Sequence, residues 1–206
     1  LIDWKGVDEI SQEIIDFVPG KKWVTDSGQD VHFIITGGEP MLWQRETQHL
    51  LRQPAFKDLK NLTIETNCTK HFKSGFDKFL HGLVNGDYTK HPVHVTWSTS
   101  PKLSISGEEW NKAIIPDVAK QYADIPNSKL YFKFVVQDDK DLEEVDKAKN
   151  EYAKAGVDAD IYLMPVGATF EGQEKTSRQV ADICLQYGYK FSPRLHVDLF
   201  GNKWGT

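Results

Sequence analysis

A short apolar run that ends in two glycines does most to restrict how this chain can fold. Residues 31–36 read Val-His-Phe-Ile-Ile-Thr, and Gly37, Gly38, Glu39 and Pro40 follow. Five of these six residues are β-branched or aromatic, which is typical of a buried parallel strand. Ligands of open α/β sheets bind at the carboxyl ends of the strands. The stretch therefore predicts a ligand site close to Glu39.

Two interpretations of Glu39 are open. Gly37 and Gly38 lack Cβ atoms, so a bulky ligand could lie against their main chain while the carboxylate accepts hydrogen bonds from an amine. The alternative is an ordinary glycine turn in which Glu39 caps the next helix.

Composition and charge exclude several classes of protein. The chain has 206 residues, of which 39% are hydrophobic, enough for one domain with a sizeable core. A net charge of -5 gives no electrostatic footprint for nucleic acid. No apolar run is long enough for a membrane span and no signal peptide is visible, which predicts a cytoplasmic protein without membrane contact. Cys68 and Cys184 are too few for a metal cluster and are expected to be ordinary buried thiols.

Apolar periodicity predicts alternating strands and helices. Strands are expected at 31–36, 62–66, 93–97, 130–136 and 160–164, helices at 7–18, 43–52, 108–122, 141–155 and about 174–187, a less regular segment at 72–83 and an extended one at 191–200. Asp141 is expected to be the N-cap of its helix. Strands about thirty residues apart indicate repeated βα units with right-handed crossovers. The predicted fold class is α/β with mostly parallel strands.

Polar residues follow four of the predicted strands. They lie at 36–39, 65–67, 98–102 and 164–167, and the carboxyl ends of parallel strands meet at one rim. Carboxylates there suit an ammonium group, hydroxyls suit a ribose, Lys102 suits a carboxylate and the backbone near Pro165 suits the edge of a base. These groups together favour a zwitterionic ligand that carries adenine. The alternative is that Lys102 is solvated and that Glu65 pairs with a neighbouring lysine.

Five segments carry a family resemblance. They are ITGGEP at 35–40, IETNCT at 64–69, STSPK at 98–102, YLMPVG at 162–167 and RLHVDLFG at 194–201. The first resembles the GGEP motif of radical S-adenosylmethionine (SAM) enzymes. All five, in this order and spacing, resemble the 7-carboxy-7-deazaguanine synthase family.

The resemblance implies a partial (β/α) barrel of the radical SAM type. It also implies a cytoplasmic homodimeric lyase of queuosine and 7-deazaguanine biosynthesis. Such an enzyme converts 6-carboxy-5,6,7,8-tetrahydropterin to 7-carboxy-7-deazaguanine with loss of ammonia. Its cofactors would be SAM, a [4Fe-4S] cluster and Mg²⁺, and its electron donor a flavodoxin- or ferredoxin-like protein. The cofactor supplies the radical chemistry, so no catalytic side chain is assigned.

The resemblance also implies roles for single residues. SAM would be contacted by Gly38 and Glu39 at its amino end, and by Ser100, Pro101, Lys102, Met164, Pro165, Val166 and Gly167. The pterin would face Thr36, Glu65, Arg194 and His196. His196 alternates with Leu195 and Val197 as on a strand, so a structural, hydrogen-bonded histidine is an equal alternative.

The chain departs from the family pattern at two places. The family's CxxxCxxC segment and its magnesium-binding threonine are expected upstream of Leu1, so no metal ligand is assigned within the chain. Residues 1–206 are therefore predicted to be a single radical SAM-type domain without its N-terminal cluster-binding segment. Cys68 stands where the family usually has glycine, which implies a local adjustment if φ is positive there. The alternative function is a cluster-free, non-catalytic relative that binds SAM or a nucleotide, or serves as a scaffold.

Overall fold

Two compact units make up the described part of the chain. The computed structural model describes residues 5–167 and 169–201. Unit 1 consists of the described residues up to Thr66, together with Lys70–Trp97 and Gln121–Lys129. Unit 2 consists of Asn67–Thr69, Ser98–Lys120 and the described residues from Leu130 onward.

The strands of the described residues form an open α/β sheet, which confirms the predicted fold class. They are β1 (His32–Ile35), β2 (Asn61–Thr66), β3 (His94–Thr99), β4 (Ser128–Val136), β5 (Asp160–Pro165) and β6 (Lys190–Phe191). Their order in the sheet is the same as their order in the sequence, with β1 and β6 at its two ends. The ladders of β1 with β2, of β4 with β5 and of β5 with β6 are parallel. An open row of parallel strands is the topology of the predicted partial barrel.

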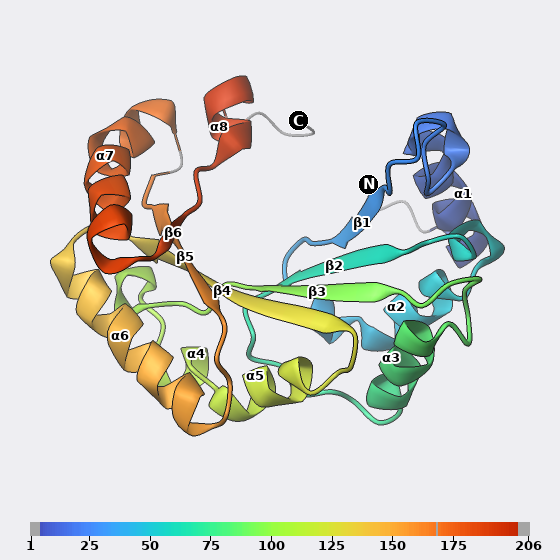
Figure 1. Ribbon diagram of the computed structural model, residues 1–206, viewed down its shortest axis with the longest axis horizontal. Helices are drawn as coiled ribbons and strands as arrows, with labels where there is room; N and C mark the ends of the chain where they lie inside the picture. The colour runs from blue at the N-terminus through green and yellow to red at the C-terminus, as the bar shows by residue number, and fades with distance from the viewer. Residues whose placement is uncertain (1–4, 168, 202–206) are drawn as a thin grey trace. The chain divides into compact units, whose positions relative to one another are not determined.

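Helices follow most of the strands (Figure 1). They are α1 (Val7–Phe17), α2 (Gln44–Leu51), α3 (Phe76–Asn85), α4 (Trp110–Ala113), α5 (Pro116–Ala123), α6 (Asp139–Lys154), α7 (Phe170–Tyr187) and α8 (Leu195–Phe200), with short 3-10 turns η1 (Pro19–Lys21), η2 (Pro40–Leu42), η3 (Pro54–Phe56) and η4 (Ser104–Ser106). No helix within 5–167 or 169–201 has the length and hydropathy required to cross a bilayer.

Three predicted elements were wrong in detail. Residues 76–83 of the segment expected to be less regular belong to the regular helix α3, and the helix expected at 108–122 is divided into α4 and α5. The division falls just before Pro116, which has no N–H to donate and begins α5. The extended segment expected at 191–200 is a two-residue strand followed by α8. Pro193 lies between them and cannot donate to a ladder, so the strand ends early.

The core of unit 1 is aromatic. In Figure 1, α2 and α3 lie on the same side of β2, and the β2 residues Leu62 and Ile64 are buried. The ring of Trp97 stacks on Tyr122 with centroids 4.3 Å apart. Phe72 stacks on the same tyrosine at 5.1 Å. Three rings in contact bury a large apolar area and hold the loop before α3 against the sheet.

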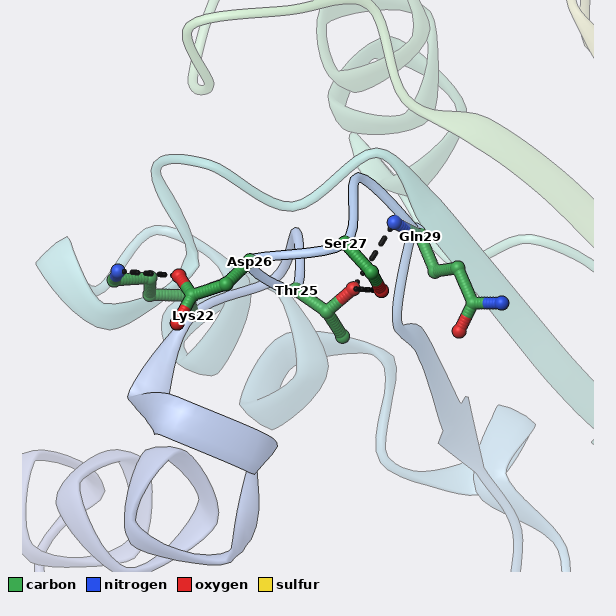
Figure 2. A network of polar contacts seen from close by, with 5 residues as sticks. All are labelled: Lys22, Thr25, Asp26, Ser27 and Gln29. Carbon is green, nitrogen blue, oxygen red and sulfur yellow. Dashed lines mark hydrogen bonds and ion pairs between the residues drawn. The ribbon is translucent and has the colours of Figure 1, made fainter.

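Side-chain contacts close the turn that leads into β1 (Figure 2). The Thr25 Oγ1 atom accepts a hydrogen bond from the Gln29 backbone N–H at 3.0 Å and lies 2.9 Å from the Ser27 hydroxyl oxygen. Lys22 forms an ion pair with Asp26 at 2.9 Å. An exposed pair of this kind contributes only about 0–1 kcal/mol. The Thr25 side chain adds to the backbone bonds of the turn, which run from Thr25 N to Gln29 O at 2.8 Å and from Gly28 N to Thr25 O at 2.9 Å.

The core of unit 2 lies between β4 and α6. Alternate β4 residues are buried, and the ring of Phe132 stacks on that of Tyr152 from α6 at 4.1 Å. The N-cap of α6 is Asp138, whose carboxylate accepts from Lys140 N at 3.0 Å. Asp141, predicted as the cap, lies inside the first turn and accepts from Gln137 N at 2.7 Å. The two aspartates form a reciprocal cap, so the helix begins earlier than predicted.

The two cysteines are both buried, and neither forms a disulfide within the described residues, as expected of ordinary core thiols. Cys68 has a positive φ of 62°, the local adjustment that the sequence implied. A left-handed conformation costs a residue with a Cβ roughly 1–2 kcal/mol. The surrounding structure of unit 2 must offset this cost.

Tyr152→Phe is expected to stabilise the protein by about 1 kcal/mol. The tyrosine is 1% exposed, and its hydroxyl has no hydrogen-bond partner within the described residues. Burial also raises its pKa far above the usual value. Removing the hydroxyl removes an uncompensated desolvation cost and keeps the ring stack on Phe132. Urea unfolding of the two proteins measures the difference, and a less stable variant would show that the hydroxyl has a partner.

Candidate functional site

In unit 1, Thr36 and Glu65 lie together at the carboxyl ends of β1 and β2. The register pairs Ile35 with Ile64, so the next residue of each strand is also adjacent. The Thr36 hydroxyl donates to Glu65 Oε2 at 2.9 Å. The structure thus joins two residues that the sequence assigned to substrate binding.

Glu39 is more buried than a rim carboxylate would be. It is 9% exposed and is the N-cap of η2, where its Oε1 atom accepts from Met41 N at 2.9 Å. The same oxygen accepts from the Thr66 hydroxyl at 2.7 Å. Glu39 therefore caps the helical turn that follows it, as the second interpretation predicted. Binding of an ammonium group is compatible with it, because an ionised carboxylate has about four acceptor positions.

The backbone beside Glu39 is open. Gly37 has a φ of 121°, a conformation that side chains with a Cβ rarely adopt. A Cβ built at Gly37 or at Gly38 would meet no atom within 4 Å. The main chain can therefore be approached closely here, as the sequence predicted for a bound ligand.

In unit 2, the predicted SAM segment 100–102 follows β3. Ser100 is half-buried, Pro101 is buried and Lys102 is exposed. Thr99, just before them, donates to Tyr131 O at 2.6 Å and joins the end of β3 to β4. An exposed Lys102 is compatible both with ligand binding and with the solvated alternative, so its role stays a prediction.

The other predicted segment of unit 2 is 164–167, at the end of β5. Val166 N donates to Val136 O at 3.0 Å, which holds the segment beside the end of β4. The Arg194 Nε group lies 3.1 Å from Met164 Sδ, so the structure brings a predicted substrate residue to a predicted SAM residue. His196 falls in α8, so its predicted place on a strand was wrong. Its side chain lies outside the described residues.

The described residues do not fit an iron-sulfur cluster or a magnesium site. Within 5–167 and 169–201, no three His, Cys, Asp or Glu residues are grouped so that they could hold a metal ion. Cys68 and Cys184 are both buried, and burial raises the pKa of the Cys184 thiol, whereas a metal ligand must be a thiolate.

The metal ligands that the sequence analysis placed upstream of Leu1 stay a prediction. Leu1 itself lies outside the described residues, which begin at Lys5.

Sequence reasoning missed Thr66. Its hydroxyl binds Glu39 across 27 positions of sequence, and only the register of β1 on β2 brings the two together. The sequence contained one signal of this. Side chains alternate along a strand, so Thr66 faces the side of the sheet opposite to Glu65.

Comparison with known proteins supports the predicted resemblance. No family model matches the chain. It is 29% identical over 175 residues to a 7-carboxy-7-deazaguanine synthase of Pyrobaculum aerophilum, covering 84% of this chain and 67% of that protein. It is 31% identical over 175 residues to a 7-carboxy-7-deazaguanine synthase of Halobacterium salinarum, covering 83% and 65%. This chain is similar in sequence to two 7-carboxy-7-deazaguanine synthases. It spans about two thirds of the length of these synthases.

Solved structures show the fold. The crystal structure of Streptococcus suis SuiB matches with a TM-score of 0.53 and 15% identity, over 93% of this chain and 44% of SuiB. The structure of SuiB bound to S-adenosylmethionine matches with a TM-score of 0.54 and 16% identity, over 94% and 43%. At this identity the likeness concerns the fold alone, and it agrees with the predicted α/β partial barrel.

Proposed function

We propose that this chain is the SAM- and substrate-binding part of a 7-carboxy-7-deazaguanine synthase. The reaction would convert 6-carboxy-5,6,7,8-tetrahydropterin to 7-carboxy-7-deazaguanine with loss of ammonia, a lyase reaction. The observation that carries this proposal is the similarity to two synthases over 175 residues each.

The role proposed for unit 1 is to hold the amino acid end of SAM. The Glu39 carboxylate would accept hydrogen bonds from the ammonium group, a charge-assisted contact of the strong kind. The main chain at Gly38 would lie against the ligand, which the open space beside it permits. When bound, SAM supplies the hydrogen-abstracting power of the reaction.

The role proposed for unit 2 is to contact the rest of SAM. Residues 100–102 and 164–167 follow β3 and β5, where irregular backbone offers N–H and C=O groups to a ligand. Lys102, on the exposed side of the first segment, would bind the carboxylate of SAM.

The pterin contacts are proposed for Thr36, Glu65, Arg194 and His196. The bond from Thr36 orients the Glu65 carboxylate, which can accept from ring N–H groups of a pterin. The guanidinium of Arg194 suits the carboxylate of the substrate, because it can donate two parallel bonds. The contact with Met164 Sδ uses only the Nε group of Arg194, so the terminal guanidinium nitrogens are still able to donate to the substrate carboxylate.

The proposal also includes properties that the family implies. They are the [4Fe-4S] cluster, Mg²⁺, the flavodoxin- or ferredoxin-like donor, the homodimer and the cytoplasmic location. The described residues offer no set of ligands for the [4Fe-4S] cluster or for Mg²⁺, so no step of the reaction is assigned to either group. The chain's own contribution is to bind and orient SAM and the pterin.

Turnover tests the proposed function. The natural protein that contains this chain, purified and reconstituted without oxygen, is expected to form 7-carboxy-7-deazaguanine and ammonia from the carboxy-tetrahydropterin in the presence of SAM. Mass spectrometry of the product and an ammonia assay measure both. SAM binding without any product, in a protein with an intact cluster, would refute the substrate assignment. SAM binding in a protein that assembles no cluster would favour the cluster-free, non-catalytic alternative.

A further inference from the structure

Two hydroxyl–carboxylate pairs lie at the ends of β1 and β2. Thr36 donates to Glu65 at 2.9 Å, and Thr66 donates to Glu39 at 2.7 Å. Successive residues of a strand face opposite sides of the sheet, so Glu65 and Thr66 point apart. The two hydroxyls therefore bond to different carboxylates.

The Glu39 carboxylate is held at two points by groups from different parts of unit 1. Met41 N, the first anchor, belongs to the turn that Glu39 itself caps. Thr66, the second, is 4% exposed and belongs to β2. Both bonds end on Oε1, so together they restrict the orientation of the carboxylate. One bond alone would leave that orientation adjustable.

We propose that Thr66 is a positioning residue of the SAM site, which fixes the Glu39 carboxylate in the orientation that binds the ammonium group. This inference rests on the proposed function, because it needs SAM to bind at Glu39. A glutamate has several rotatable side-chain bonds, and a ligand that must order them binds more weakly. The Thr66 hydroxyl orders the Glu39 side chain before SAM binds.

Thr66→Val tests the role, because valine keeps the shape of threonine and removes the hydroxyl. The affinity for SAM, measured by isothermal titration calorimetry, is expected to fall about tenfold, the effect of losing a hydrogen bond to a charged group. Thr66→Ser keeps the hydroxyl and is expected to stay within about twofold of the unmodified protein. Equal loss in both variants would overturn the positioning role.

Thr89 provides a matched control in the same unit. It is 8% exposed, and its hydroxyl donates to His91 O at 2.7 Å, the same length as the Thr66 bond. Thr89→Val is expected to lower the stability about as much as Thr66→Val and to leave SAM affinity within about twofold. A tenfold loss of SAM affinity in this control would show that any buried hydroxyl matters, which also overturns the proposal.

A double-mutant cycle with Glu39→Gln shows whether Thr66 acts through Glu39. In the Glu39→Gln protein, Thr66→Val is expected to lower SAM affinity by less than about twofold, because the carboxylate it orients is gone. A full tenfold effect in that background overturns the positioning role and leaves the proposed function standing. If Glu39→Gln leaves SAM affinity unchanged, or the unmodified protein does not bind SAM, the proposed SAM site itself falls.

Discussion

Glu39→Gln is expected to lower the affinity for SAM about a hundredfold, roughly 3 kcal/mol, while the fold is kept. The proposed contact is between a carboxylate and an ammonium group, and the amide removes its charge. The side chain is 9% exposed, so little water screens the pair. Calorimetric titration with SAM measures the effect.

Glutamine is the informative replacement because of the two bonds to Oε1. Its amide oxygen can still accept from Met41 N and from the Thr66 hydroxyl, so neither donor is left unsatisfied. Alanine would remove the acceptor of both bonds, at about 1–3 kcal/mol each, and would confuse binding with stability.

Glu46→Gln is the control for net charge, because Glu46 is an exposed residue of α2 in the same unit. It is expected to leave SAM affinity unchanged. Should Glu39→Gln bind SAM as well as Glu46→Gln does, Glu39 is only a cap of η2.

Trp97→Ala is expected to destabilise the protein by about 4 kcal/mol. Trp97 is fully buried, and its ring stacks on Tyr122 at 4.3 Å and lies 5.9 Å from Phe72. Its removal leaves a large cavity that rigid neighbouring rings cannot fill by collapse. Guanidinium unfolding of the variant gives the change in free energy.

Two variants separate the cavity from other causes. Trp97→Phe keeps a ring in the stack and removes an indole N–H that has no partner within the described residues, so a loss of only about 1–2 kcal/mol is expected. Trp43 is 61% exposed, and Trp43→Ala is expected to change stability by about 0.5 kcal/mol or less. Equal losses at Trp97 and Trp43 would show that unit 1 does not depend on this ring stack.

Most of the strands could be predicted because their apolar residues run without interruption. The run at 31–36 and the run at 130–136 correspond to β1 and β4, each within a few residues. The helix α3 was missed, although Phe76, Phe79, Leu80 and Leu83 have helical spacing and are all buried. This error was one of pattern recognition, since the signal was in the sequence.

The C-terminal error has a different cause. Leu195, Val197 and Leu199 alternate as on a strand, yet only Val197 is buried, and the other two are more than half exposed in α8. Alternation predicts a strand only where a neighbouring strand can pair with it. The ladder of β6 with β5 covers two residues although β5 continues to Pro165, and Pro193, which cannot donate to a ladder, ends the strand.

Local pattern was sufficient to predict the α/β class, the strand that delivers Glu39 and the residues that resemble those of the synthases. These properties follow from side-chain chemistry and from spacing along the chain. Which hydroxyl meets which carboxylate, and that Glu39 is buried and caps η2, could be learned only from the tertiary structure. A hydrogen bond requires placement within a few tenths of an ångström, and across 27 positions that placement is set by strand register and packing.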